Sequence, residues 1–248
     1  MSEFLRQFAA ATGLLTRLPI WRVVPDAPAN FAAGVWAYPV VGGIVGAIGG
    51  FIYALCWHIG LPPAIAGIWT VAAMLLTTGA LHEDGLADTA DGLGGGASAE
   101  RKLAIMRDSR IGSYGALALV LALATRGVAI TEIARPLDVA AALIVSGAVS
   151  RATIIVVLLA SQPARKDGMA AVLSEIPSAQ ACAGLAIAAL LAILLLPSGS
   201  FLALVAITIT TGIGAAMLAR AQIGGHTGDI LGASAIVADC LVLTLLAR

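Results

Sequence analysis

Long apolar segments separated by short polar ones run along most of the chain. A membrane-spanning helix needs about 20 apolar residues to cross a hydrocarbon core of roughly 30 Å. About seven segments approach that length: 38–58, 62–81, 112–134, 138–160, 180–196, 200–219 and 228–247. The pattern predicts an all-α fold, a polytopic membrane helix bundle of about seven transmembrane helices that forms a single integral membrane domain over residues 1–248.

The composition agrees with this prediction. Hydrophobic residues make up 60% of the chain and charged residues only 11%, and the mean hydropathy is +0.99. Such a chain needs a lipid bilayer as its solvent. The formal net charge is zero, so no basic excess is present to recruit nucleic acid, and we expect no nucleic-acid partner.

The N-terminal segment 1–30 has a different pattern. Its apolar residues recur at roughly helical spacing, at Phe4, Leu5, Phe8, Leu14 and Leu15. Arginines and a proline interrupt this stretch, unlike the apolar core of a secretory signal. We expect residues 3–15 to form a helix that lies along the membrane interface.

The loops between the spans predict the orientation. Lysine and arginine accumulate on the cytoplasmic side of membrane proteins. One set of alternate loops holds Arg6, Arg17, Arg22, Arg101, Lys102, Arg107, Arg110, Arg165, Lys166 and Arg220, whereas the other holds only Arg135 and Arg248. We therefore expect a multi-pass protein of the bacterial cytoplasmic (inner) membrane, with its N-terminus and active site facing the cytoplasm.

Glycines gather on one side of the first span, at positions 42, 43, 46, 49 and 50. Small residues let membrane helices approach closely, so this face is predicted to pack against another helix.

An acidic cluster follows the second span, at the start of the segment 82–111, which we expect to be a cytoplasmic motif loop. Asp84, Asp88 and Asp91 are spaced so that a helix would place all three within a sector of roughly 60°. Crowded carboxylates repel each other unless a cation compensates them. Hard oxygen ligands favour Mg²⁺ or Mn²⁺, so the three aspartates are candidate metal ligands. A solvated acidic turn would not require this helical spacing.

Two neighbours of the aspartates have less defined roles. Glu83 points about 100° away from Asp84 on a helix, so it is a candidate outer-sphere residue or catalytic base. His82 is either a hydrogen-bonding residue of the interface or a contact to substrate.

A basic motif precedes the third span, on the same side of the membrane. It contains Arg107, Asp108, Ser109, Arg110 and Gly112. Arginine forks match phosphate oxygens, and backbone N–H groups at a helix start favour anions, so the motif indicates a phosphate clamp. The alternative is a loop anchored to anionic lipid.

A glycine-rich motif opens the last span. Gly225, Thr227 and Gly228 would allow close approach of a ligand, and Asp229 is a further metal ligand, a general base, or only a helix N-cap.

Two arginines lie within apolar spans, where a charge usually faces a cavity or a partner. Arg151 is predicted to reach inward toward a phosphate, and Arg126 to pair with Glu132 or Asp239.

Carboxylates that hold a divalent cation, opposite arginines and glycines, are typical of phosphoryl transfer. Asp91 and Asp229 are the candidates for the base that deprotonates an incoming hydroxyl.

The motifs HEDGLADTADG, RDSRIGSYG and GGHTGDILGA, with the pair Ser150-Arg151 inside a span, resemble the adenosylcobinamide-GDP ribazoletransferase family, also called cobalamin-5′-phosphate synthase. The resemblance extends from TRLP at residues 16–19 to the last span. It implies that the 3′-hydroxyl of α-ribazole, or of its 5′-phosphate, attacks the cobinamide-attached phosphate of adenosylcobinamide-GDP and releases GMP. Mg²⁺ is the implied cofactor. One departure is Glu83, which stands where the commoner HLDG motif has an apolar residue.

The sequence is also compatible with other classes of protein. A CDP-alcohol phosphotransferase or a prenyltransferase also uses aspartate motifs in the membrane, but the former should show Ala-Arg where this chain has Ala87-Asp88. A cation carrier would place its carboxylates near the midplane rather than at the end of a span. A homodimer is a further expectation, since oligomers are common.

Overall fold

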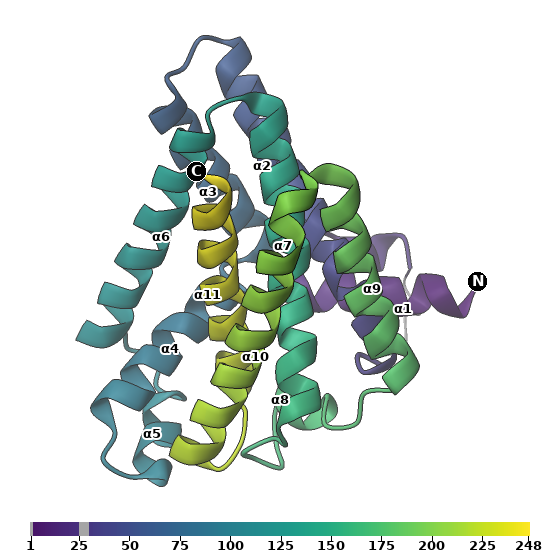
Figure 1. Cartoon of the computed structure of the whole chain (residues 1–248). Helices are drawn as coiled ribbons and strands as arrows, with labels where there is room; N and C mark the ends of the chain where they lie inside the picture. The colour runs from purple at the N-terminus through teal and green to yellow at the C-terminus, as the bar shows by residue number, and fades with distance from the viewer. Residues whose placement is uncertain (1, 25–29) are drawn as a thin grey trace.

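The protein is a bundle of helices in a computed structural model that describes residues 2–24 and 30–248 (Figure 1). The α-helices are α1 (Glu3–Leu15), α2 (Tyr38–His58), α3 (Pro63–Thr78), α4 (Leu81–Gly95), α5 (Ala99–Ile105), α6 (Ser113–Ile133), α7 (Pro136–Ala160), α8 (Met169–Val172), α9 (Ser178–Leu195), α10 (Phe201–Ile223) and α11 (Gly228–Leu246). Short 3₁₀ turns, η1 (Ile20–Arg22), η2 (Ala33–Ala37) and η3 (Ser198–Ser200), lie between them. The described residues contain no strand, only one β-bridge between Pro163 and His226.

The membrane-spanning helices match the predicted spans. Among the described residues, 6 helices are long and apolar enough to cross a membrane: η2 with α2, α6, α7, α9, α10 and α11. A seventh span is formed if α3 and α4, which meet at 90°, are taken together. The prediction of a polytopic all-α bundle with about seven spans is therefore confirmed. Figure 1 shows α4, α5 and α8 at one end of the bundle, and the connections α2–α3 and α6–α7 at the other.

The segment 82–111 is not the loop that we expected. The apolar helix α3 ends at Thr78, and Gly79 and Ala80 both adopt left-handed backbone conformations that turn the chain. α4 then runs at 90° to α3, and α5 follows it. α4 packs small and polar residues, including Gly85 and Ala87, against its neighbours in the bundle. A search of the sequence for long apolar segments does not detect a helix of this composition.

The glycines of α2 form the packing face that the sequence predicts. A Cβ atom at Gly42 would collide with the carbonyl oxygen of Gly147 on α7, and one at Gly46 would collide with that of Leu143. α7 is the central helix, since 83% of its most apolar window is buried inside the protein. The backbones of α2 and α7 therefore touch, as small residues in membrane helices allow.

The N-terminal helix lies across the bundle. α1 has the predicted bounds, and Figure 1 shows it roughly perpendicular to the long helices. Trp36 holds it in place, because its indole N–H donates to Gln7 Oε1 at 2.8 Å and its ring meets Phe4 edge-on. Met1 and residues 25–29 of the expected segment 1–30 lie outside the described residues.

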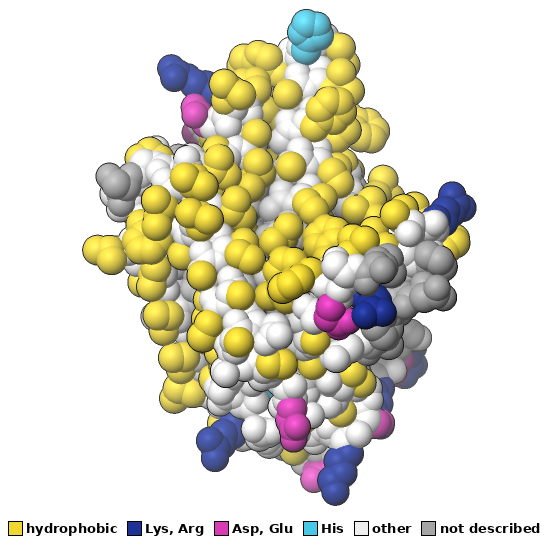
Figure 2. Space-filling model, turned by 90° about the vertical axis from the view of Figure 1, so that its right-hand side faces the viewer, with side chains coloured by type: hydrophobic (Ala, Val, Ile, Leu, Met, Phe, Trp, Pro, Cys, Tyr) yellow, Lys and Arg dark blue, Asp and Glu magenta, His cyan; other side chains and the backbone are white. Residues whose placement is uncertain are grey.

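The surface follows the same plan. Figure 2 shows hydrophobic side chains over most of one face of the bundle, with charged side chains gathered mainly toward the end that carries α4, α5 and α8. A broad apolar belt of this kind suits contact with lipid.

Candidate functional site

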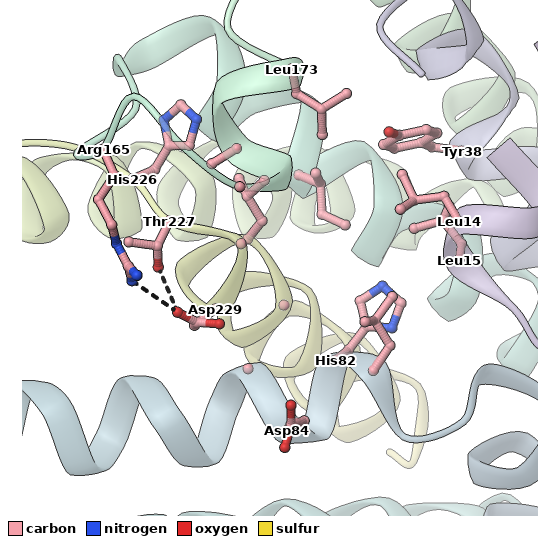
Figure 3. A pocket seen from close by; sticks show the side chains of 18 of the residues that line it. Leu14, Leu15, Tyr38, His82, Asp84, Arg165, Leu173, His226, Thr227 and Asp229 are labelled. Atoms are coloured by element: carbon pink, nitrogen blue, oxygen red, sulfur yellow. Dashed lines mark hydrogen bonds and ion pairs between the residues drawn. The ribbon is translucent and has the colours of Figure 1, made fainter. Parts of the chain in front are cut away.

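A cavity of about 360 Å³ lies among α1, the start of α2, α4, the segment 165–173 and the start of α11. Its polar lining comprises His82, Asp84, Arg165, Asp167, His226, Thr227 and Asp229. Figure 3 shows that these groups are not evenly spread: Arg165, Thr227 and Asp229 lie at one end, and Leu14, Leu15 and Tyr38 at the other. The cavity therefore has a polar end and an apolar end.

The crossing of α4 and α11 brings two of the predicted motifs together. At Gly85 a Cβ atom would lie 2.8 Å from the carbonyl oxygen of Asp229, so only glycine allows this approach. Gly232 packs in the same way against the backbone of His82: a Cβ atom at Gly232 would lie 3.2 Å from the Cα atom and the carbonyl oxygen of His82. As a result, Asp84 of α4 and Asp229 of α11 line the same cavity, although they are 145 residues apart in the sequence (229 minus 84).

The carboxylates at this crossing repel each other. Burial, and then the charges of Asp84, Asp229 and Asp91, raise the pKa of Asp88 from 3.8 to about 6. Asp88 lies on α4, which has turned away from the apolar span α3, and it is half-buried. Within residues 2–24 and 30–248, no arginine or lysine forms an ion pair with Asp84 or Asp88. The site thus carries uncompensated negative charge.

This donor set suits a hard divalent cation. Asp84 and Asp88 offer carboxylate oxygens that no protein cation uses, and oxygen ligands of this kind favour Mg²⁺. No three histidine, cysteine or acidic side chains of the described residues already converge on one point. The chemistry of the residues fits Mg²⁺, and their side chains would have to turn toward it.

Asp91, the third predicted metal ligand, has partners within the protein. Its Oδ2 accepts a hydrogen bond from the backbone N–H of Gly112 at 2.7 Å, and its Oδ1 accepts one from that of Gly115 at 2.9 Å. Cβ atoms at either glycine would collide with the carboxylate. Asp91 therefore caps the start of α6, and the N–H group of Gly112, which we expected to face phosphate, is bonded to it.

The rest of the basic motif lies outside the lining of the cavity. Arg107 pairs with Asp167 at 2.9 Å, and Asp167 lies at the cavity wall. Arg110 pairs with its neighbour Asp108 at 2.6 Å, and 86% of its side chain is exposed. Hydrogen bonds from Arg110 lower the pKa of Asp108 to about 2. Ser109 is exposed at the tip of this turn. Only Arg107 approaches the cavity, and it does so through Asp167.

Some residues of the glycine-rich motif line the cavity, and others only support the fold. Thr227 is the N-cap of α11: its hydroxyl accepts from the N–H of Ile230 at 3.3 Å and donates to Asp229 Oδ2 at 3.1 Å. Gly228 lines the cavity and has open space where a Cβ would stand. Gly225 instead packs against the backbone of Gln162, where a side chain would collide.

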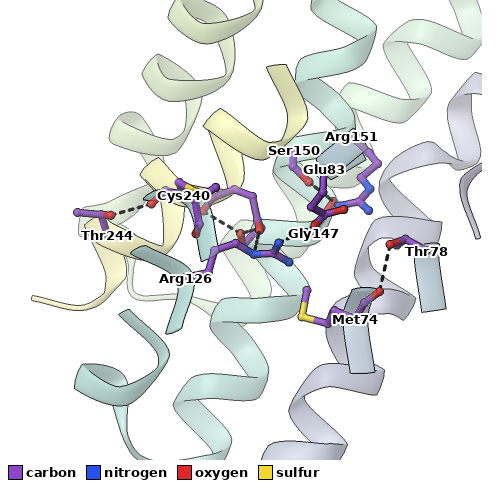
Figure 4. A network of polar contacts seen from close by, with 12 residues as sticks. Met74, Thr78, Glu83, Arg126, Gly147, Ser150, Arg151, Cys240 and Thr244 are labelled. Carbon is purple, nitrogen blue, oxygen red and sulfur yellow. Dashed lines mark hydrogen bonds and ion pairs between the residues drawn. The ribbon is translucent and has the colours of Figure 1, made fainter. Parts of the chain in front are cut away.

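Glu83 and the two intramembrane arginines belong to a buried polar network (Figure 4). Arg126 pairs with Glu83 at 2.6 Å and with Asp239 at 3.0 Å, so the predicted pairing with Asp239 is confirmed and that with Glu132 is wrong. Arg151 donates to the hydroxyl of Ser150 at 2.9 Å and lies outside the lining of the cavity. The network is buried, and none of these residues lines the cavity. The partner of Glu83 is therefore Arg126, and this contact is structural.

Sequence reasoning missed several residues of the cavity, among them Tyr38, Asp167 and His226. Arg165, which the sequence predicts only to be a cytoplasmic charge, lies 3.6 Å from Asp229. Tyr38 and His226 are buried at the wall. For His226 a signal was present, since it stands within the glycine-rich motif, and for Arg165 the signal was the turn residues Asp167 and Gly168 that follow it.

Comparison with known proteins identifies the lineage. The family model described as cobalamin-5-phosphate synthase matches residues 7–247. Adenosylcobinamide-GDP ribazoletransferases of Bradyrhizobium diazoefficiens, Mesorhizobium japonicum and Rhizobium johnstonii are similar to the chain. The first is 41% identical to this chain, and the match covers 96% of this chain and 91% of the relative. The second is 38% identical, with 97% of this chain and 92% of the relative covered. The third is 40% identical, with 100% of this chain and 98% of the relative covered. No solved structure matches. Because the match spans nearly the whole length of both partners, the chain belongs to the cobalamin-5-phosphate synthase family of transferases.

Proposed function

We propose that the chain joins α-ribazole, or its 5′-phosphate, to adenosylcobinamide-GDP with release of GMP, and that the reaction takes place at the polar end of the cavity. The observation that carries the proposal is that Asp84 and Asp229, from two distant motifs, line one cavity. This arrangement puts a cluster of carboxylates next to a space large enough for a small substrate.

Mg²⁺ is the proposed cofactor, held by Asp84 and Asp88. When bound, it would neutralise the charge that develops on the diphosphate as GMP leaves. Support comes from the raised pKa of Asp88, which reflects crowded charge that a cation would relieve. Asp91 supports the same helix by capping α6.

Asp229 is the proposed general base. Its Oδ2 accepts a hydrogen bond from the hydroxyl of Thr227, which fixes the carboxylate while its other oxygen stays available. The carboxylate takes the proton of the attacking 3′-hydroxyl, a new O–P bond forms to the cobinamide-attached phosphate, and the bond from that phosphate to GMP breaks. Arg165 lies where it can neutralise a phosphate oxygen once its weak pairing with Asp229 is exchanged.

The guanosine diphosphate part of the donor is proposed to meet the basic motif at the rim. The pair Arg107–Asp167 is exposed, and exposed pairs contribute little stability, so a phosphate can compete for the arginine. Arg110 is also exposed, and a phosphate can compete with Asp108 for it in the same way.

For location, we propose the bacterial inner membrane with the cavity on the cytoplasmic side. Support comes from the lysines and arginines of the segments that flank the cavity, which follow the positive-inside rule. A homodimer is also proposed, to be tested by light scattering of the purified protein in detergent.

The decisive experiment measures GMP release by purified protein. We expect release only when adenosylcobinamide-GDP, α-ribazole and Mg²⁺ are all present. The variants Asp84→Asn, Asp88→Asn and Asp229→Asn should each lower turnover at least about a hundredfold. Asp138→Asn is the matched control, because Asp138 is exposed at the start of α7, at the other end of the bundle. Full activity of Asp84→Asn and Asp88→Asn would rule out the metal site, and turnover without Mg²⁺ would rule out the cofactor.

A further inference from the structure

The size of the cavity separates the two substrates. A volume of about 360 Å³ lies at the lower end of the range for small-molecule sites. A nucleoside is of this size, whereas a corrinoid that carries a guanosine diphosphate is several times larger. The cavity can therefore enclose the acceptor and not the donor.

The lining of the cavity follows the chemistry of the same molecule. The benzimidazole base of α-ribazole is flat and apolar, and its ribose carries hydroxyls. Leu14, Leu15 and Tyr38 form the apolar end, and Leu173 closes it from α8's side (Figure 3). Apolar and aromatic side chains of this kind bind a flat base by burial and ring packing. Asp229 and Thr227 at the polar end face the space that a ribose would fill.

Buried polar atoms at the wall provide an independent observation. Both ring nitrogens of His82, the hydroxyl of Tyr38 and Nε2 of His226 have no hydrogen-bond partner among the described residues. All three side chains are at most 2% exposed. Buried polar groups are normally satisfied, so three such groups around one cavity indicate a ligand that supplies donors and acceptors. The hydroxyl of Ser161 lies 2.8 Å from Nδ1 of His226 and fixes the orientation of the ring. Nε2 of the same ring has no partner among the described residues.

We infer that this cavity is the seat of the nucleoside acceptor, with the benzimidazole base against Tyr38 and Leu173 and the ribose toward Asp229. The inference rests on the proposed function and deepens it. It places the attacking hydroxyl beside the proposed base, and it leaves the corrinoid of the donor outside the cavity. The polar atoms of Tyr38, His82 and His226 have almost no accessible surface, so these side chains turn toward the ligand when they bind the ring nitrogen of the base and the hydroxyls of the ribose.

The test fills the apolar end and measures the two substrates separately. In Leu173→Trp we expect the KM for α-ribazole to rise about tenfold or more, while the KM for adenosylcobinamide-GDP stays within about twofold. Leu202→Trp is the matched control, because Leu202 is 79% exposed on α10 and is not part of the cavity lining. Free benzimidazole should compete with α-ribazole and not with adenosylcobinamide-GDP. An increase confined to the KM for adenosylcobinamide-GDP would overturn the inference while leaving the proposed function intact.

Two further measurements keep the test decisive. If Leu173→Trp fails to fold, Tyr38→Phe removes only a hydroxyl and should raise the KM for α-ribazole a few-fold with no change for the donor. Calorimetric binding of α-ribazole to Asp88→Asn protein should equal that to the unaltered chain, because Asp88 is a proposed metal ligand that does not line the cavity. Binding without any transfer by the unaltered chain would contradict the proposed function alone. Absence of α-ribazole binding in a protein that turns over would contradict the seat.

Discussion

The Oε1 atom of Glu83 lies 2.6 Å from Nη1 of Arg126, which joins the start of α4 to the middle of α6. Both side chains are almost fully buried, at 8% and 3% exposure. With Asp239 and Arg151 nearby, the network holds two negative and two positive charges. The two ion pairs of Arg126, with Glu83 and with Asp239, position α4 against α6 and α11, because a buried charge needs a partner.

Removing one charge from this network should destabilise the fold. We expect Glu83→Gln or Arg126→Gln alone to cost about 3 kcal/mol, because each leaves a buried charge uncompensated. The double variant restores neutrality and should lose clearly less than the sum of the two. Thermal unfolding in detergent gives the stabilities. A stable Glu83→Gln protein that folds normally but has no turnover would instead assign Glu83 a direct catalytic role.

The contact between Asp91 and α6 leads to a second prediction. Gly115→Ala places a methyl group against the carboxylate of Asp91, so α4 and α6 must separate. We expect lower thermal stability and lower turnover, although no proposed metal ligand is changed. Gly127→Ala is the control on the same helix, since a Cβ there meets nothing within 4 Å. Equal behaviour of the two variants would show that the cap does not position α4.

Asp88 should make stability depend on pH and Mg²⁺. Its pKa in the folded protein, about 6, lies above the ordinary value of 3.8, so the folded state binds the proton more tightly than the unfolded state. Without Mg²⁺, this group therefore favours folding increasingly as the pH falls from about 6 toward 4, and its charge costs stability above that range. Mg²⁺ requires the charged form, so its stabilising effect should be large at pH 7.5 and lost near pH 5.

The variant Asp88→Asn checks this explanation. Without Mg²⁺ at neutral pH it should melt a few degrees higher than the unaltered chain, because one repelling charge is removed. Added Mg²⁺ should no longer raise its melting temperature. A lower melting temperature for the metal-free variant would contradict the charge crowding at this site.

The contact of α2 with α7 gives a fourth prediction. Gly42→Ala introduces a methyl group that collides with the carbonyl of Gly147, so the two central helices must move apart. We expect a loss of about 1–3 kcal/mol, as for an overpacked core. Gly214→Ala on α10 is the comparison, since a Cβ there meets nothing within 4 Å and should be neutral or slightly stabilising. Unfolding midpoints measured in the same detergent compare the two.

The sequence by itself determined the spans, the N-terminal helix and the order of the motifs. α1 and α9 begin and end within two residues of the predicted segments 3–15 and 180–196. These features are local, because apolar length and helical spacing are properties of consecutive residues. The glycine face of α2 was predictable for the same reason.

Only the tertiary structure decided which polar groups meet. Asp84 and Asp91 look alike in the sequence, yet one lines the cavity and the other caps α6, because that depends on which helices pack against α4. Glu83 faces Arg126, and Arg165 approaches Asp229, through contacts between residues far apart in the chain. Helical spacing fixes the direction of a side chain relative to its own helix axis, and the packing of neighbouring helices alone determines what it faces.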